Sequence, residues 1–315
     1  MRNTVITLTL NPAIDETVQI DDFASGKVNR VINSSRYPGG KGINVAVFLA
    51  DYSLNVISAG FLGKTNDAIF NSMFKLKGIM DKCFRIDGST RIGIKIIDQV
   101  KSETTDINYP GITPADKDIK NLYDAIEDFS KKHKWFVFSG SIPSGLSSDI
   151  YCDLIRIIKK NKGFVLLDTS GDAFRNAVES GPYLIKPNID ELSEYAGMEL
   201  TSVEEIIKAG RKFFNYGIKI VIISMGEKGA LFLNNEYSIS AVPPSGINVV
   251  STVGAGDAMV SGALCALVHK ISFPDLTRMA TAFSMSAVMS IELGLSDRNL
   301  IAEYMKEVKL EYLDY

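Results

Sequence analysis

Cysteine, histidine and tryptophan are scarce in this chain of 315 residues, which contains three, two and one of them. Cys83, Cys152 and Cys265 are scattered without the spacing of metal-ligand pairs, and they resemble small buried apolar residues. Such cysteine usage suits a reducing cytosol, so a cytoplasmic location is expected. His133 and His269 have no cysteine or carboxylate partner in the sequence, and we assign them no role.

The chain also lacks a long apolar run and an excess of basic residues. No stretch is long and apolar enough to cross a bilayer, and the short apolar start lacks the features of a secretory signal. With 34 Lys and Arg against 37 Asp and Glu, the formal net charge is −3, whereas nucleic-acid-binding proteins usually carry a basic excess. Neither a membrane nor a nucleic acid is therefore expected as a partner.

Apolar residues are abundant, at 46% of the chain, and allow a large core. From residue 113 onward, segments with helical periodicity alternate with short apolar segments, which predicts a parallel sheet covered by helices on both faces. The predicted strands include 3–10, 55–60, 135–138, 164–167 and 218–224. The predicted helices include 45–52, 114–131, 149–160, 201–216, 274–290 and 297–307, one that ends at about 77, and one that follows Gly256.

Two polar segments depart from this pattern and contain short alternating pieces typical of strands. The first runs from about Ile14 to Pro38, with pieces at 17–20 and 30–32. The second is a hairpin of 91–97 and 103–108 around a turn at 99–102. We predict that segments of about 12–37 and 88–110 pair into one small sheet, which lies as a lid over the main body.

The segment 252–257, Thr-Val-Gly-Ala-Gly-Asp, precedes an apolar stretch without proline that is predicted to be a buried helix. Gly254 and Gly256 leave backbone N–H groups unobstructed at the helix start, where unpaired N–H groups and the helix dipole favour an anion. A carboxylate at Asp257 would stand beside a bound phosphate and could accept a proton from an attacking alcohol. A helix-capping role is the alternative for Asp257.

A second glycine-rich segment, 39–44 with the sequence Gly-Gly-Lys-Gly-Ile-Asn, also opens a predicted helix. It gathers N–H groups, a lysine and a carboxamide, which suits a polyhydroxylated or phosphorylated ligand, although a plain turn is the alternative. Small polar residues follow several predicted strands and mark one sheet edge as the ligand-binding edge. They include Asp15, Ser139, 168–171 and 224–229.

Three further patterns limit the assignment. Asn188 and Glu191 begin another helix, either as a capping box or as a pair associated with a metal. The segment 60–65 is not a phosphate-binding P-loop, because Ser58 stands where its first glycine is required. Met259 stands where the third glycine of a dinucleotide fingerprint belongs, which argues against an NAD-dependent oxidoreductase.

Taken together, the Gly-Gly-Lys-Gly segment at 39–42 and the Thr-Val-Gly-Ala-Gly-Asp segment at 252–257 resemble the two signatures of the PfkB (ribokinase-like) family of carbohydrate kinases. The resemblance extends along essentially the whole chain. It implies a single domain over 1–315, with a three-layer α/β/α core, a mostly parallel sheet and a small β lid. It also implies ATP with Mg²⁺, a sugar held between lid and core, and a homodimer formed through the lid.

The resemblance also implies roles for individual residues. Asp257 is expected to be the base on the sugar hydroxyl, with Gly254, Ala255 and Gly256 as the anion hole. The expected substrate-binding residues are Asp15, Gly39, Gly40, Lys41, Asn44, Arg91, Asn108 and Ser139. The expected nucleotide-binding residues are Lys186, Asn188, Ser224, Gly226, Gly229 and Thr252 with Gly254 and Gly256, and Glu191 is expected to support the metal through water.

Within the family, the chain is most similar to kinases that phosphorylate fructose 1-phosphate at its 6-hydroxyl to give fructose 1,6-bisphosphate. The segments that carry this similarity include 9–15, 90–91 and 294–298. Kinases of tagatose 6-phosphate or fructose 6-phosphate are the alternatives with the same chemistry. A non-catalytic sensor of sugar phosphate or nucleotide is an alternative of another class, and the intact Asp257 argues against it.

Overall fold

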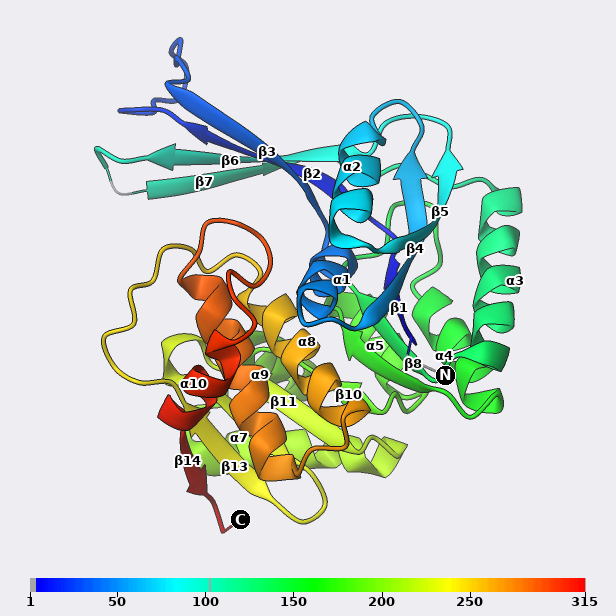
Figure 1. Ribbon diagram of the computed structural model, residues 1–315, viewed down its shortest axis with the longest axis vertical. Coiled ribbons are helices and arrows are strands. Elements are labelled where there is room, and N and C mark those ends of the chain that lie inside the picture. Colours follow the sequence, from blue (N-terminus) through cyan, green and yellow to red (C-terminus); the bar gives the residue numbers. More distant parts are fainter. Residues whose placement is uncertain (1–3, 102, 315) are drawn as a thin grey trace.

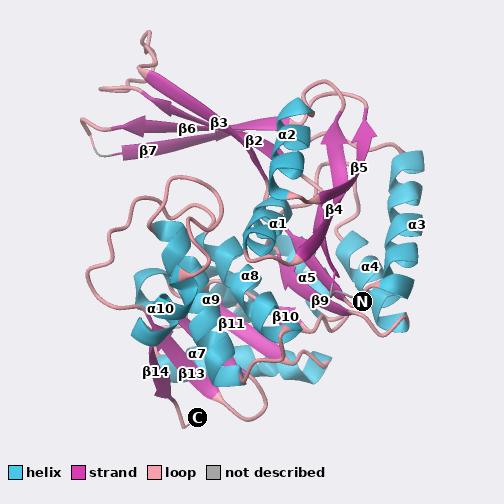
Figure 2. Ribbon diagram, viewed as in Figure 1, coloured by secondary structure: helices cyan, strands magenta, loops and turns pink. Residues whose placement is uncertain are grey.

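The computed structural model of the protein describes residues 4–101 and 103–314. Asn3 of the first predicted strand and Ser102 of the predicted hairpin turn lie outside these ranges. Two separate sheets, one of ten strands and one of four, organise the described chain (Figures 1 and 2). The larger sheet forms the body of the molecule, and the smaller one projects from it.

The ten-stranded sheet is parallel over most of its width. Its strand order is β14-β13-β12-β11-β10-β9-β8-β1-β4-β5, with parallel pairing from β11 to β5 and antiparallel pairing from β11 to β14. The mostly parallel sheet predicted from the sequence is therefore confirmed. Its strands are β1 (Thr4–Thr9), β4 (Asn55–Gly63), β5 (Met80–Ile86), β8 (Trp135–Ser139), β9 (Phe164–Asp168), β10 (Leu184–Ile185), β11 (Ile220–Ser224), β12 (Ala230–Leu233), β13 (Ser238–Val242) and β14 (Lys309–Tyr312).

Helices cover both faces of this sheet, which confirms the three-layer α/β/α class (Figure 2). On one face, the apolar cluster that contains Phe48 and Phe283 packs under α1 (Lys41–Asp51), α2 (Ala68–Lys77), α8 (Ala255–Val268), α9 (Phe273–Val288) and α10 (Leu300–Glu307). On the other face, the cluster that contains Phe136 and Phe213 packs under α3 (Asp116–Lys132), α4 (Ile150–Lys160), α5 (Gly171–Val178), α6 (Ile189–Ala196) and α7 (Val203–Arg211). Each described helix is too short or too polar to span a bilayer.

Several elements differ from the sequence prediction. Strands β5 and β14 and helix α5 were not predicted. Strand β14 is largely exposed, and β5 mixes polar with apolar residues without alternation, so neither has the pattern of a buried strand. The single helix predicted over 201–216 is instead α7 followed by a 3-10 helix, η1 (Lys212–Tyr216). Of these elements, α5 begins directly after the carboxyl end of β9, at the predicted ligand-binding edge.

The four-stranded sheet has the order β3-β2-β6-β7 and stands clear of the helical layers in the upper left of Figure 1. Its strands are β2 (Ala13–Gln19), β3 (Asn33–Gly39), β6 (Arg91–Asp98) and β7 (Glu103–Asn108). They fall almost entirely within the two segments proposed for the lid. The second strand begins at Asn33 rather than at 30–32, and its edge position tolerates Pro38, which has no N–H to donate.

Candidate active site

The two glycine-rich segments, far apart in the sequence, meet at the starts of helices α1 and α8. Gly40 caps α1 with φ +114° and Gly254 caps α8 with φ +79°, backbone conformations that favour glycine. The side chains that follow touch, because Asn44 donates a hydrogen bond from Nδ2 to Asp257 Oδ2 at 2.8 Å. Two helix starts, each favourable to an anion, therefore face the same region.

Asp257 is buried at this meeting point, with 5% of its surface exposed. Burial, assisted by the nearby negative charge of Asp168, raises the pKa of Asp257 to about 7. Lys41, the Asn44 hydrogen bond and Lys186 act in the opposite direction. A carboxylate with a pKa near neutrality is suited to general base catalysis, because it is a stronger base than an ordinary aspartate and about half of it is ionised at pH 7.

Two lysines share one buried carboxylate beside Asp257. Asp168 Oδ1 lies 3.4 Å from Lys41 Nζ and 3.3 Å from Lys186 Nζ. Burial alone would raise the pKa of Asp168, but the two ammonium groups hold it below its ordinary value. A Cβ added at Gly256 would lie 3.2 Å from Lys186 Nζ, so this ammonium group sits against the first turn of α8.

Asp168 is the residue of this group to which the sequence assigned no role. The only sequence signal was its position directly after a buried strand, at the predicted ligand-binding edge. Its two partners lie 127 and 18 residues away in the sequence, so their convergence arises from tertiary structure alone. The arrangement holds two cations together, which is the charge distribution that a polyphosphate requires.

A cavity of about 450 Å³ lies between the four-stranded sheet and the main body. Three of the predicted substrate-binding residues line it, namely Asp15 on β2, Asn44 on α1 and Asn108 on β7. Phe48 and Val253 are among its apolar lining. Asn44 also donates a hydrogen bond to Asp257, so the buried carboxylate lies directly behind this part of the cavity wall.

The remaining predicted substrate-binding residues do not line this cavity. Gly39 ends β3 against Asp15, where an added Cβ would be 2.0 Å from Asp15 Oδ2. Arg91 begins β6 and influences Asp15, whose pKa is raised by burial against the opposing charges of Arg91 and Lys95. Ser139 is fully buried at the end of β8, and its Oγ has no hydrogen-bond partner among the described residues.

The predicted nucleotide-binding residues gather at the ends of neighbouring strands. Asn188 Oδ1 accepts a hydrogen bond from Glu191 N at 2.7 Å, and Glu191 Oε2 accepts one from Asn188 N at 2.9 Å, so the capping box is present. Ser224 bridges to Asn188 and leads into η2 (Gly226–Lys228), next to Gly229. Thr252 lies two residues before the cap of α8.

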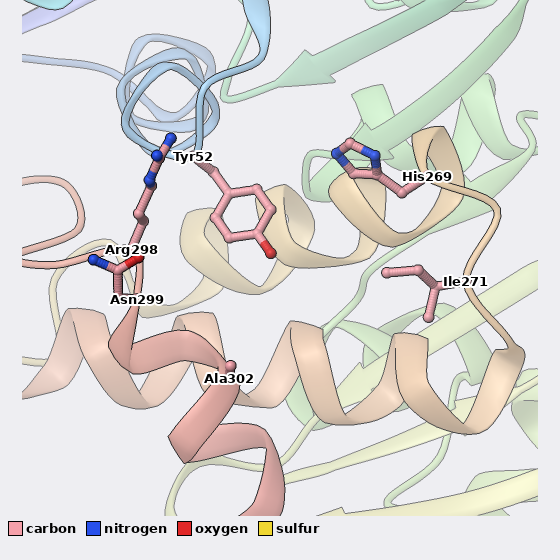
Figure 3. A pocket seen from close by; sticks show the side chains of 6 residues that line it. All are labelled: Tyr52, His269, Ile271, Arg298, Asn299 and Ala302. Atoms are coloured by element: carbon pink, nitrogen blue, oxygen red, sulfur yellow. The ribbon is translucent and has the colours of Figure 1, made fainter.

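No group of three or more His, Cys, Asp or Glu side chains that could hold a metal ion occurs in the described part of the chain. A second cavity, of about 480 Å³, is lined by residues that include Tyr52, His269 and Arg298. Figure 3 shows Tyr52 between the other two. Tyr52 and His269 cap the C-terminal ends of α1 and α8, so this cavity lies at the opposite ends of those helices from Asp257.

The family of the chain gives the class of protein to which this fold and site belong. Residues 4–298 match the family described as pfkB family carbohydrate kinase, and the chain belongs to this family. The expected resemblance is thus confirmed.

Two named relatives and one solved structure show which carbohydrate kinases this chain resembles. A 1-phosphofructokinase of Vibrio cholerae is 36% identical over 313 residues, which cover 99% of this chain and 98% of the relative. A 1-phosphofructokinase of Xanthomonas campestris is 39% identical over 290 residues, which cover 90% and 91%. The solved structure of phosphofructokinase-2 from Escherichia coli superposes with a TM-score of 0.89 at 26% identity and covers 97% of this chain and 99% of that one.

Proposed function

We propose that this carbohydrate kinase transfers the γ-phosphoryl group of ATP to the 6-hydroxyl of fructose 1-phosphate and so forms fructose 1,6-bisphosphate. The observation that carries the proposal is the contact between Asn44, which lines the cavity of about 450 Å³, and the buried carboxylate of Asp257, which we propose is the base. Relatives named 1-phosphofructokinase along nearly the whole chain support the substrate. Tagatose 6-phosphate and fructose 6-phosphate are the competing acceptors.

In the proposed reaction, Asp257 accepts the proton of the 6-hydroxyl as that oxygen bonds to the γ-phosphorus. The bond from the γ-phosphorus to its bridging oxygen breaks, and ADP leaves. The raised pKa of Asp257 increases its basicity, and the hydrogen bond from Asn44 fixes the direction in which the carboxylate points. Most of the rate acceleration would come from positioning and charge stabilisation rather than from proton transfer alone.

The negative charge of the transferred group requires fixed positive partners. We assign this role to the N–H groups of 254–256 at the start of α8 and to Lys41 and Lys186. Asp168 holds the two ammonium groups before the nucleotide arrives, which lowers the reorganisation needed during transfer. Ser224, Gly226 and Gly229 form the proposed nucleotide loop at the ends of the neighbouring strands.

Mg²⁺ is proposed to accompany ATP, where it would neutralise phosphate charge. The described residues offer no cluster of three acidic or histidine ligands, so a protein cage for the ion does not fit. A magnesium ion held mainly by phosphate oxygens and waters does fit, because Mg²⁺ retains waters and needs only one or two carboxylates. Glu191, placed on the first turn of α6, is the proposed carboxylate and would act through water.

The four-stranded sheet is proposed to act as a lid that closes over bound sugar and excludes water. Hydrogen exchange in β2 and β6 should slow at saturating fructose 1-phosphate, and unchanged exchange would contradict closure. We further propose a homodimer through this sheet, because every residue of its edge strand β7 is exposed and an open edge can pair with another copy. Light scattering that reports a monomer would exclude the dimer.

The substrate is tested by a coupled assay of ADP release. Fructose 1-phosphate, fructose 6-phosphate, tagatose 6-phosphate and unphosphorylated fructose are compared at saturating ATP. The highest kcat/KM is expected with fructose 1-phosphate. A higher value with either of the other phosphates would reassign the substrate, and the absence of turnover with all of them would favour the sensor.

A further inference from the structure

The cavity between the two sheets is lined by more acidic than basic side chains, although its proposed ligand is a phosphorylated sugar. Lys95 on β6 is the one cationic side chain among the described residues that line it, whereas Asp15, Asp106 and Glu292 contribute carboxylates. Lys41 and Arg91, the two cations among the predicted substrate-binding residues, do not line the cavity, and Lys41 is already paired with Asp168. A phosphorylated sugar therefore needs another cation there.

Lys95 forms an ion pair with Asp106 that is weak enough for a ligand to replace. Its Nζ lies 3.1 Å from Asp106 Oδ1 across the β6 and β7 pair, and the two side chains are 33% and 57% exposed. An ion pair with this much exposure contributes little to stability, because water and salt screen it. A phosphate carries more charge than a carboxylate and offers three oxygens, so it competes well for the ammonium group.

The position of Lys95 along its strand also suits a side chain that binds a phosphate on the sugar. Gly93, which pairs with Asp15, and Lys95 both line the cavity from β6. Lys95 is two residues farther along, or about 6–7 Å along the strand. Asn44, at the core end of the cavity, contacts Asp257. A sugar with its acceptor hydroxyl at one end and its phosphate at the other would span these two ends.

We propose that Lys95 leaves Asp106 and binds the phosphate already present on the substrate, and that it thereby distinguishes phosphorylated from unphosphorylated sugar. This inference rests on the proposed function, since it concerns the same cavity. Asp106 lies on the edge strand and turns toward solvent when the phosphate takes its place.

The test compares four variants of the full chain, two at Lys95, one at Asp106 and one control. Lys95→Met removes the charge and keeps an unbranched apolar stem, and Lys95→Arg restores a cation. Arg36→Met is the matched control, because Arg36 Nε pairs with Glu16 Oε1 at 3.0 Å on the same sheet. Glu16 alternates along β2 with Asp15 and Thr17, which line the cavity, so the control pair lies on the opposite face.

For each protein, kcat/KM is measured with fructose 1-phosphate and with fructose, and fructose 1-phosphate binding is measured by calorimetry without ATP. Lys95→Met should weaken binding and kcat/KM for fructose 1-phosphate by about 10- to 100-fold, with fructose nearly unaffected. Lys95→Arg should recover much of the loss, and Arg36→Met should match the wild type. Asp106→Asn, which removes the competing carboxylate, should tighten binding by up to about fivefold.

The outcomes separate the two proposals. Wild-type turnover of fructose 1-phosphate decides the proposed function, whereas the ratio of dissociation constants for Lys95→Met and wild type decides the role of Lys95, even if turnover is absent. A Lys95→Met constant within twofold or so of wild type overturns the inference. So does an equal loss for Asp106→Asn, which would mean that the ion pair only holds the sheet together, and so does a wild type that binds no fructose 1-phosphate.

Discussion

Replacing Asp168 by asparagine tests whether the buried charges around Asp257 act as one unit. The substitution removes the carboxylate that lies 3.3 Å from Lys186 Nζ and 3.4 Å from Lys41 Nζ. Asp257 then loses a neighbouring negative charge that raises its pKa. It also faces two ammonium groups that no longer have a common partner, so both effects lower the pKa of Asp257.

The expected pKa shift of Asp257 and the expected loss of stability follow from the charges involved. A charge a few ångströms away typically moves a carboxyl pKa by about 1–3 units, so that of Asp257 should fall from about 7 to between about 4 and 6. Lys186 is only 5% exposed, and removing the partner of a buried ion costs about 3–5 kcal/mol of stability. The variant should therefore be less stable and should remain active at lower pH.

The assay is kcat/KM for fructose 1-phosphate between about pH 5 and about pH 9 at saturating ATP. Asp257 must be ionised to accept a proton, so wild-type kcat/KM should fall about tenfold per pH unit below about pH 7. In Asp168→Asn this decline should begin at lower pH, whatever maximum value of kcat/KM the variant reaches.

Asp51→Asn is the matched control. Asp51 Oδ1 pairs with Lys77 Nζ at 2.7 Å at the far end of α1, so this change removes a comparable ion pair away from the site. It should reduce stability without moving the pH at which activity declines. A folded Asp168→Asn enzyme whose decline stays within about 0.3 pH unit of wild type would refute the coupling of Asp168 to Asp257.

Two further predictions concern the stability of the Asp257→Asn variant and the sugar binding of the Gly39→Ala variant. Because the pKa of Asp257 is raised in the folded protein, its stabilising contribution is lost as pH rises from about 4 through about 7. Asp257→Asn should therefore gain thermal stability relative to wild type over this range, and a Tm difference that does not change with pH would contradict the buried-carboxylate assignment. In Gly39→Ala, the added Cβ would lie 2.0 Å from Asp15 Oδ2 and force it to move, so KM for fructose 1-phosphate should rise by about tenfold or more while KM for ATP changes less. An unchanged sugar KM would remove Asp15 from the proposed sugar site.

The sequence predicted the large sheet best where local pattern and tertiary structure agree. Strands β8 and β9 are short apolar runs, and α3 and α4 have clear helical periodicity, so each was placed within a few residues. Strand β14 gave no such signal, because an exposed edge strand needs no apolar alternation. Strand β3 could not be placed locally, since its register with β2, from Ala13 opposite Gly39 to Gln19 opposite Asn33, is set by pairing.

The candidate site divides in the same way. Glycine-rich segments before helices have a local signature, so the helix starts at Gly40 and Gly254 could be predicted from the sequence. The sharing of Asp168 by two lysines and the pairing of Lys95 with Asp106 are contacts between separate elements, and nothing in the local sequence indicates them. The sequence supplied candidate groups, and the fold determined which of them interact.

Turnover of the Asp257→Asn variant tests the central claim most directly. Asparagine keeps the size of the side chain and an oxygen that can accept the Asn44 hydrogen bond, but it cannot take a proton from the sugar. Proton transfer by a positioned group contributes about 10²- to 10⁴-fold, so kcat with fructose 1-phosphate should fall by that factor while KM for ATP changes little. A folded variant that turns over within about threefold of wild type would show that Asp257 is not the catalytic base.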